Sequence, residues 1–188
     1  MKTLWLDFET TGLDPEEHDL LEIGAVLSDD DFKVIGALSL PVRPQTKTVT
    51  QWKRDVDQTV LDMHTETGLW SYVAQRGVPL ENAQDFFYSW LDSKTAPGET
   101  LALGGSGVAR FERPWIRKCL PMLEKGLHYR ERDASSVRYV LSDAGIDIPP
   151  REIGDVIPHR AQSDAYDSYH QWVWAMGYLI RTDLGVPA

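Results

Sequence analysis

Hydrophobic residues near the N-terminus form short runs of the kind that build β-strands. Residues 4–8, Leu-Trp-Leu-Asp-Phe, form one run, and residues 20–28 and 32–40 form two more. The polar residues 28–31, Ser-Asp-Asp-Asp, separate the second run from the third and are typical of a turn. We therefore expect three neighbouring strands, the last two joined as a hairpin, at the start of a mixed sheet.

The middle of the chain has apolar residues at three-to-four spacing, which predicts helices over residues 55–63, 69–75 and 80–91. Residues 101–103, Leu-Ala-Leu, then predict a short buried strand, and residues 104–107, Gly-Gly-Ser-Gly, predict a turn after it. Residues 111–120 predict another helix, in which Pro114 is tolerated because it falls in the first turn.

Two helices are expected in the last third of the chain. Residues 133–136, Asp-Ala-Ser-Ser, resemble an N-cap that leads into a helix through Leu141 and ends near Gly145. Residues 162–180 predict a long final helix with aromatic residues on its inner face. Strands followed by alternating helices and a strand are typical of an α/β or α+β layered domain.

The composition is that of an ordinary globular protein, with 42% hydrophobic and 26% charged residues in 188 positions. This length fits one domain, residues 1–188. The single cysteine, Cys119, cannot form an intramolecular disulfide and fits a reducing compartment. The first apolar run is too short for a signal peptide, and no stretch approaches the roughly 20 apolar residues that span a bilayer. We therefore expect a cytoplasmic protein with no membrane partner.

The net charge of −10 argues against a protein that binds long duplexes. Such proteins usually carry a basic face, because neutralising phosphates supplies much of their affinity. An acidic nuclease fits this charge if divalent cations mask its acidic cluster and if its substrate is short or held only at its end. The charge therefore bears on substrate length more than on the type of reaction.

The most informative segment is Asp7-Phe8-Glu9-Thr10-Thr11-Gly12. On a strand, Asp7 and Glu9 point to the same face, because side chains alternate with a period of two. Two neighbouring carboxylates repel each other unless a cation lies between them. An exposed strand face could hold them in solvent, whereas at the end of a buried strand they fit a metal site.

Two other acidic positions are less distinctive when each is taken alone. Asp164 falls at the start of the last predicted helix, where the helix dipole favours an acid, and His159 precedes it on a loop. Glu112 follows the glycine-rich turn and fits a first-turn acid of its helix in the same way. Each of these patterns by itself favours a structural role.

The acids together indicate a different arrangement, because all of them fall at or near the ends of predicted elements. Mg²⁺ and Mn²⁺ prefer oxygen ligands. Two such ions about 3.5–4 Å apart can activate a water and stabilise the leaving oxygen of a phosphodiester. A neutral histidine beside them, here His159, can accept the proton of that water.

On these motifs the sequence resembles the DEDDh, or DnaQ-like, 3′–5′ exonucleases. The family's first motif, Asp-x-Glu-Thr-Thr-Gly, is matched in full at residues 7–12, and Leu-Glu-Ile-Gly-Ala-Val at residues 21–26 also matches. The last motif, His, four residues, then Asp, is matched by His159 and Asp164. The middle motif has Phe-Asp in the family and Phe111-Glu112 here. The resemblance covers nearly the whole chain.

Within the family, the oligoribonuclease branch looks closest. Asp14-Pro15 after Thr-Gly-Leu is similar, as is His64-Thr65-Glu66-Thr67-Gly68-Leu69. The stretch with Met122-Leu123-Glu124, residues 127–130 and residues 133–136 also resembles that branch.

The resemblance implies an α/β fold with an RNase H-like mixed sheet flanked by helices. It implies hydrolysis of phosphodiester bonds in short oligonucleotides or at single-stranded RNA or DNA ends, with release of 5′-mononucleotides. It further implies two divalent cations, Mg²⁺ or Mn²⁺, bound by Asp7, Glu9, Glu112 and Asp164, with His159 as the general base.

The resemblance also implies residues that contact the substrate. They are Thr10, Thr11, Gly12, Leu13, Met63, His64, Ser106, Arg130 and Ser135. Leu13 would wedge against the terminal base, and Ser106, Arg130 and Ser135 would hold a phosphate. In oligoribonucleases the arginine comes from a second subunit, which would make this chain a homodimer. From the residues alone, Leu13 also fits turn packing, Arg130 a surface charge, Ser135 a helix cap and His64 a surface histidine.

Two departures from the family pattern affect these expectations. Glu112 is longer than the family's Asp by a methylene, about 1.5 Å of reach, and a metal cluster with tight geometry can suffer from this. The tryptophan that oligoribonucleases carry before the His-Thr segment is missing, and Met63 would replace its stacking less rigidly. Because of Glu112, the alternative to an active exonuclease is a nucleic-acid end-binding module with weakened catalysis. A third hypothesis, a subunit of a larger replication or decay machine, ranks below both.

Overall fold

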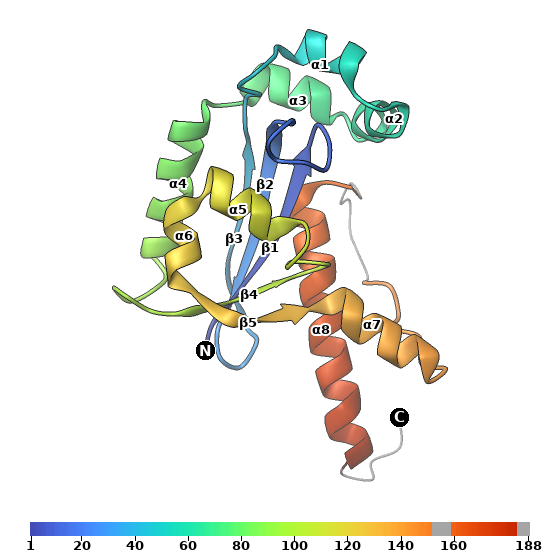
Figure 1. The fold of residues 1–188 in the computed structure, drawn as a ribbon. Helices are drawn as coiled ribbons and strands as arrows, with labels where there is room; N and C mark the ends of the chain where they lie inside the picture. The colour runs from blue at the N-terminus through green and yellow to red at the C-terminus, as the bar shows by residue number, and fades with distance from the viewer. Residues whose placement is uncertain (152–158, 184–188) are drawn as a thin grey trace.

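A mixed β-sheet of five strands lies at the centre of the computed structural model, which describes residues 1–151 and 159–183 (Figure 1). Its strand order is β3-β2-β1-β4-β5. The strands are β1 (Thr3–Thr10), β2 (Leu20–Ser28), β3 (Val34–Pro41), β4 (Leu101–Gly105) and β5 (Leu127–Asp133). β2 pairs antiparallel with β1 and β3, whereas β4 pairs parallel with β1 and β5. This is the mixed sheet with flanking helices that the sequence predicted.

The alternation of side chains along β1 separates the two faces of the sheet. Leu4, Leu6 and Phe8 lie in the main hydrophobic core, which α4 (Leu80–Asp92), α5 (Glu112–Cys119) and α6 (Pro121–Gly126) cover. Trp5 lies on the opposite face, where it packs against residues of the long helix α8 (Ala161–Asp183). Figure 1 shows α8 running alongside the sheet. Because side chains alternate, Asp7 and Glu9 share the α8 face with Trp5.

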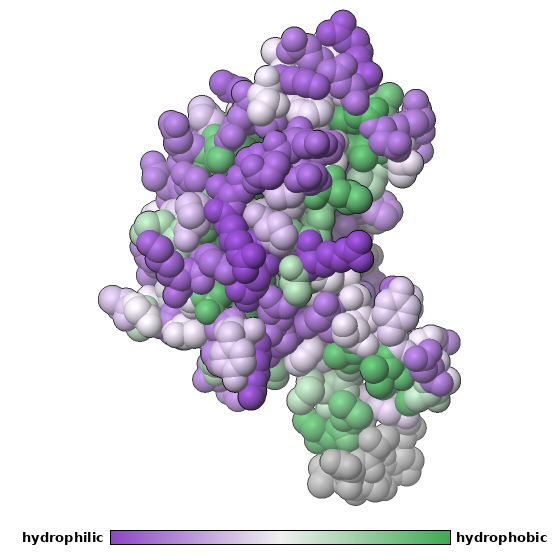
Figure 2. Space-filling model, viewed as in Figure 1, coloured by the Kyte–Doolittle hydropathy of each residue, from purple (hydrophilic) through white to green (hydrophobic). Residues whose placement is uncertain are grey.

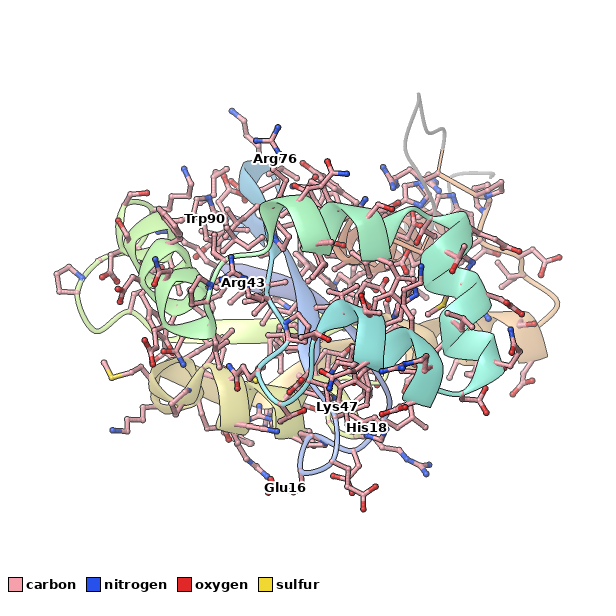
Figure 3. All side chains as sticks on the ribbon, turned by 90° about the horizontal axis from the view of Figure 1, so that it is seen from above. Glu16, His18, Arg43, Lys47, Arg76 and Trp90 are labelled. Atoms are coloured by element: carbon pink, nitrogen blue, oxygen red, sulfur yellow. The ribbon has the colours of Figure 1, made fainter. Side chains whose placement is uncertain are left out.

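Three short helices close one end of the sheet, where β1 ends and β2 begins. They are α1 (Val49–Asp55), α2 (Gln58–Glu66) and α3 (Leu69–Arg76). Trp52 of α1 is buried and donates from Nε1 to Asp19 Oδ2 at 2.7 Å. His18 and Lys47, labelled in Figure 3, both contact the Trp52 ring, with centroid distances of 5.9 Å from the imidazole and 4.3 Å from Nζ. These contacts fix the loop after β1 that carries Gly12 and Leu13.

Most elements that the hydrophobic pattern predicted are confirmed. β2 and β3 form the expected hairpin, and Asp29 caps its turn by accepting from the backbone amides of Asp31 and Lys33. The helix after Asp133 is α7 (Ala134–Asp143), with Asp133 as its N-cap, and α8 spans the predicted final helix. Tyr166, Tyr169 and Trp172 of α8 pack towards the sheet, as expected for its inner face.

The helix predicted over residues 55–63 is wrong in its bounds. α1 ends at Asp55 and α2 begins at Gln58, because the Asp57 side chain accepts from the Thr59 amide and starts a new helix. The turn predicted over residues 104–107 begins later, since Gly104 and Gly105 belong to β4.

The pattern missed α1, α6 and β5. β5 consists of Leu-His-Tyr-Arg-Glu-Arg-Asp, which has no apolar alternation because the strand lies at the sheet edge and has no fully buried residue. α6 contains six residues, too few to show a helical period.

The visible face in Figure 2 is mostly hydrophilic, and hydrophobic colours gather at its lower end, where α7 and the second half of α8 lie. Exposed Tyr139 and Val140 of α7 and Ile180 of α8 belong to this region of the molecule. Among the helices of residues 1–151 and 159–183, none is both long and apolar enough to cross a membrane.

Candidate active site

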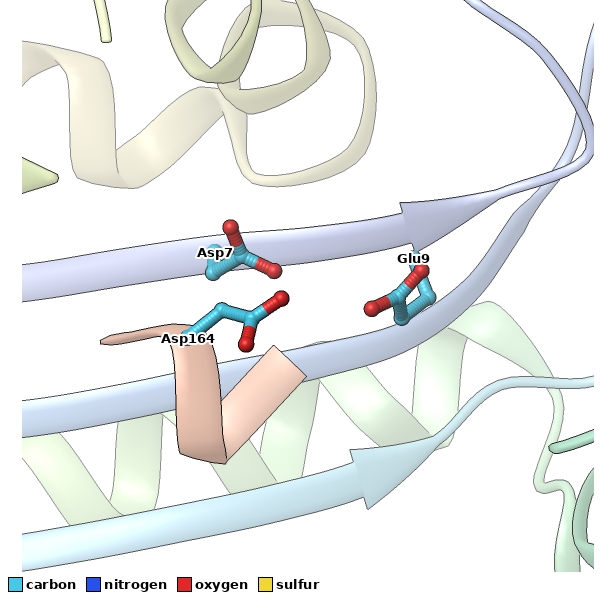
Figure 4. Close-up of side chains that lie close together, drawn as sticks. All are labelled: Asp7, Glu9 and Asp164. Atoms are coloured by element: carbon cyan, nitrogen blue, oxygen red, sulfur yellow. The ribbon is translucent and has the colours of Figure 1, made fainter. Parts of the chain in front are cut away.

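Three carboxylates meet between β1 and the first turn of α8 (Figure 4). Asp7 and Glu9 come from β1, and Asp164 comes from α8. Each offers an oxygen, and these oxygens all lie within 4.8 Å of one another. Asp7 and Glu9 face this point because of the two-residue period of β1, and Asp164 does so because α8 starts directly over β1 and β2.

The surroundings of the three acids disfavour their charged forms. Burial, followed by repulsion from Glu9, Asp164 and Glu112, raises the pKa of Asp7 well above its usual value. Burial and the nearby Asp164 raise the pKa of Glu9 to about 8. The pKa of Asp164 is raised as well, chiefly by burial. Without a cation the site favours bound protons, so a divalent ion that supplies positive charge would replace them.

Glu112 lies close by but outside this group of three. It is the first residue of α5, is 1% exposed, and its Oε2 has no hydrogen-bond partner. Burial and the charges of Asp133 and Glu131 raise its pKa to about 8. An unpartnered buried carboxyl oxygen is costly, and a cation is one partner that would satisfy it.

A pocket of about 200 Å³ opens onto these acids. Its lining includes the expected site residues Asp7, Glu9, Thr10, Gly12, Leu13, Met63, His159 and Asp164. It also includes Phe8 and Phe111, which stand within the sequence motifs but were not expected as site residues, and Val60, which stands in none of the motifs. Val60 stands one helical turn before Met63 on α2, so the helical period was the signal for it. Leu13 is 81% exposed at the pocket, which is unusual for a leucine that only packs a turn.

His159 lines this pocket and also a neighbouring one of about 390 Å³ formed largely by α2. It is exposed, and one residue, Arg160, separates it from the start of α8. Its φ of 55° lies in the left-handed region, which is uncommon for a residue other than glycine and costs about 1 kcal/mol or more. Burial raises the pKa of Asp164, and the nearby His159 opposes part of this rise, which indicates that the two side chains interact.

Two expected substrate residues have supporting positions instead. His64 is fully buried, not at the surface; its Nε2 lies 2.8 Å from the Thr10 carbonyl and its Nδ1 lies 3.7 Å from Glu9 Oε2. Burial lowers the pKa of His64, which favours a neutral ring. Its Nε2–H donates to the Thr10 carbonyl at the end of β1, whereas its Nδ1 has no hydrogen-bond partner in the described part of the chain. Thr11 is buried too, and its Oγ1 accepts from the Asp19 amide at 2.9 Å.

The three residues expected at a phosphate do not line the pocket. Ser106 is exposed after β4. Ser135 donates to Asp133 Oδ1 at 2.6 Å at the start of α7. Arg130 lies exposed on the edge strand β5, with its guanidinium 5.3 Å from the Tyr129 ring centroid. Within one chain, then, none of the three contributes to the lining of this pocket.

Comparisons with known proteins agree with this geometry. The exonuclease (RNase_T) family model matches residues 4–75, which contain Asp7 and Glu9. The chain is 28% identical over 171 residues to an oligoribonuclease of Corynebacterium glutamicum, covering 90% of this chain and 76% of the relative. It is 29% identical over 168 residues to an oligoribonuclease of Mycobacterium leprae, covering 89% and 76%.

Solved structures share the fold. Escherichia coli exonuclease I in complex with a dT13 oligonucleotide superposes with a TM-score of 0.63 at 18% identity, and exonuclease I of Methylocaldum szegediense with a TM-score of 0.61 at 18%. Each match covers 96% of this chain, but the chain spans only about two fifths of the length of those enzymes.

The family match and the relatives together support an exonuclease of the DnaQ-like class, a 3′–5′ phosphodiester hydrolase, and the solved structures share its fold. Within that class the relatives place it near the oligoribonuclease branch.

Proposed function

We propose that this exonuclease removes 5′-mononucleotides one at a time from the 3′ end of short oligonucleotides or of single-stranded RNA or DNA. The observation that carries the proposal is the convergence of Asp7, Glu9 and Asp164 within 4.8 Å at a pocket that His159 also lines. The net charge of −10 supports a substrate that is short or held only at its end.

The donor set fits two divalent cations, Mg²⁺ or Mn²⁺. Four carboxylates with raised pKa values offer oxygen ligands, and one of their oxygens, Glu112 Oε2, has no other partner. Asp7, Glu9, Glu112 and Asp164 would hold the ions. When bound, such a pair of ions activates a water and stabilises the leaving oxygen.

The remaining chemistry belongs to the side chains around the acids. His159 stands at the pocket with an exposed imidazole, which accepts the proton of the attacking water. Leu13 and Met63 supply apolar surface for the terminal base, and Met63 also faces the neighbouring pocket, which gives room for a second nucleotide. His64 binds the Thr10 carbonyl from the buried side and so supports the end of β1, directly after Glu9.

Arg130 completes the site of a second copy in a homodimer. This follows from the resemblance to oligoribonucleases, and it accounts for an exposed arginine that lies apart from the pocket of its own chain. Mixing two inactive variants, Asp7→Asn and Arg130→Ala, should restore activity, because a mixed dimer contains one site with both Asp7 and Arg130. If each variant chain has no partner in solution, or if the mixture stays inactive although light scattering shows mixed dimers, Arg130 does not act in trans.

The test of the proposed function is a turnover assay on a ladder of 5′-labelled RNA and DNA oligomers, with Mg²⁺ and Mn²⁺ added separately. We expect metal-dependent shortening from the 3′ end, release of mononucleotides, and loss of activity in Asp7→Ala and His159→Ala. Intact oligomers of every length with both metals, from a folded protein, would exclude an active exonuclease.

A second candidate is a module that binds nucleic-acid ends without turnover. Glu112 favours this candidate for two reasons. It stands outside the group of three acids, and it is longer than the Asp that the family has at this position. This candidate predicts metal-assisted binding by the unchanged chain and a gain of hydrolysis in Glu112→Asp. If the unchanged chain hydrolyses oligonucleotides and Glu112→Asp does not increase the rate, the binding-only candidate is excluded.

A further inference from the structure

A further buried acid, Glu22 of β2, lies next to the carboxylate site without joining it. Glu22 is 0% exposed and pairs across the sheet with Glu9. Its side chain points to the same face as that of Glu9, because directly opposed residues of an antiparallel pair share a face. A buried carboxylate in such a place needs partners of its own.

The start of α8 supplies most of these partners. Arg160 binds Glu22 with two hydrogen bonds, Nε to Oε2 at 2.9 Å and Nη2 to Oε1 at 2.6 Å. The backbone amide of Ala161 donates to Oε2 at 3.2 Å, and Ser39 of β3 donates to Oε1 at 2.9 Å. The Tyr72 ring covers the guanidinium at 4.6 Å. The paired fork geometry fixes the direction as well as the distance of the arginine.

Gly24 allows the helix to approach this closely. A Cβ added at Gly24 would lie 2.0 Å from the carbonyl carbon of Ala161 and 2.2 Å from the amide nitrogen of Gln162. Gly24 pairs with Asp7 across β1 and β2. The backbone of β2 therefore touches the backbone of α8 directly beside the site.

Arg160 and Ala161, which make these contacts, stand in the sequence between His159 and Asp164, the two proposed functional residues of this segment. His159 directly precedes Arg160 and holds an unfavourable φ of 55°. Asp164 follows one helical turn later, and its amide donates to the Arg160 carbonyl at 3.1 Å. A rigid attachment at residues 160 and 161 therefore sets the backbone of His159 and the position of Asp164 together.

We propose that Glu22 and Arg160 are positioning residues of this exonuclease, which, with Gly24, fix the start of α8 on β2 and so hold Asp164 against Asp7 and Glu9. Neither residue lines the pocket, so both act through their neighbours. The proposal rests on the proposed function for its kinetic consequence, whereas its consequence for metal binding can be measured without turnover.

Arg160→Gln tests the pair directly. Loss of the fork lets the first turn of α8 shift, and a shift of about 1 Å at a reacting centre can lower turnover about 100-fold. We expect kcat to fall about 100-fold while KM for a short oligonucleotide stays within about threefold. We also expect the Kd of Mn²⁺ for the substrate-free protein, measured by calorimetry, to rise at least about tenfold.

Two control variants remove hydrogen bonds that do not attach residues 160 and 161. Ser39→Ala takes one donor from the same Glu22 oxygen that Arg160 Nη2 binds. Tyr169→Phe removes the bond from the Tyr169 hydroxyl of α8 to the Phe32 carbonyl, 2.7 Å. Both should lower Tm yet keep kcat and the Mn²⁺ affinity within about twofold of the unchanged protein.

Two more variants separate positioning from stability. Arg160→Lys keeps the charge without the fork and should give kcat between those of the unchanged protein and Arg160→Gln. The double variant Glu22→Gln, Arg160→Gln leaves no buried charge unpaired, so its Tm should exceed that of Arg160→Gln while its kcat stays low. If Arg160→Gln does not fold, these two variants decide the question.

The outcomes are distinct. If the unchanged protein hydrolyses the oligonucleotide and Arg160→Gln matches Ser39→Ala in both kcat and Mn²⁺ affinity, the pair only stabilises the fold and the proposal is overturned. If kcat recovers with Tm in the double variant, it is overturned as well. If the unchanged protein hydrolyses nothing, the proposed function fails, and the Mn²⁺ affinities of Arg160→Gln and Ser39→Ala still decide whether the pair positions Asp164.

Discussion

At the scale of single residues, the carboxylates of the site repel one another. Asp7 is bordered by Glu9, Asp164 and Glu112, and all three raise its pKa in addition to the larger effect of burial. Among residues 1–151 and 159–183, Arg160 opposes this for Glu9, whose pKa it lowers. The arrangement therefore gives up stability in the metal-free protein and recovers it when cations bind.

Asp7→Asn tests whether repulsion among the acids lowers the stability of the metal-free protein. Removing one charge relieves the repulsion, so the metal-free variant should melt about 2–4 °C higher than the unchanged protein at pH 8, which corresponds to about 1 kcal/mol for a chain of this size. Its exonuclease activity should fall more than about 100-fold, because the proposed function makes Asp7 a direct metal ligand, which matters at least as much as the groups that orient ligands. Thermal melts with EDTA and a turnover assay with Mn²⁺ measure the two effects.

Asp85→Asn is the matched control for Asp7→Asn. Asp85 lies exposed on α4, so this change should alter neither melting nor turnover. A metal-free Asp7→Asn variant that melts below the Asp85→Asn control would show that the acids do not repel one another in the folded protein.

At the scale of elements, close backbone packing holds β1, β4 and α8 together. Gly104 of β4 pairs with Trp5 of β1 in a parallel register, and a Cβ added at Gly104 would lie 2.4 Å from the Trp5 ring. That ring is fully buried, packs against Tyr169 and Trp172 of α8, and donates to Ser28 at 3.0 Å. Because of these contacts, the Trp5 indole cannot move away from a Cβ added at Gly104.

Gly104→Ala should destabilise the protein by about 1–3 kcal/mol, the usual cost of overpacking a dense core. Gly126→Ala is the comparison, because a Cβ added at the end of α6 meets nothing within 4 Å. That second change should be neutral or stabilise by up to about 1 kcal/mol. Urea unfolding measures both, and equal free energies of unfolding for the two variants would contradict the tight contact at Trp5.

At the scale of the whole molecule, pH and divalent cations should act on stability together. The pKa values of Glu9 and Glu112 are about 8 in the folded protein, whereas a glutamate in an unfolded chain titrates near 4.5. Between these values the folded state binds more protons than the unfolded state. The metal-free protein therefore loses stability as pH rises from about 4.5 to about 8.

We expect the melting temperature measured with EDTA to fall over that pH range and the gain from added Mn²⁺ to be larger at pH 8 than at pH 6. Cations bind more tightly at high pH because they no longer compete with protons. The variant Glu9→Gln, Glu112→Gln should show a weaker pH dependence with EDTA. A metal-free melting temperature that is constant from pH 5 to pH 8 would rule out the raised pKa values.

The sequence was most informative where the decisive signal is local. A two-residue period put Asp7 and Glu9 on one face of β1, and a helix-start pattern put Asp164 in the first turn of α8. Local signals were missing for β5, which is a charged edge strand, and for the break between α1 and α2, which depends on the capping bond of Asp57. The supporting positions of His64 and Thr11 were also invisible, because burial depends on what packs over a residue.

By itself, then, the sequence determined most of the strands and helices, the acids at their ends and the kind of chemistry those acids favour, because periodicity and capping act over a few neighbouring residues. Only the tertiary structure decided which acids meet. It brought Asp164 to Asp7 and Glu9, left Glu112 outside their group, and joined Glu22 to Arg160 across 138 positions of the chain. Those distances depend on how α8 and α5 pack on the sheet, which is a property of the whole core.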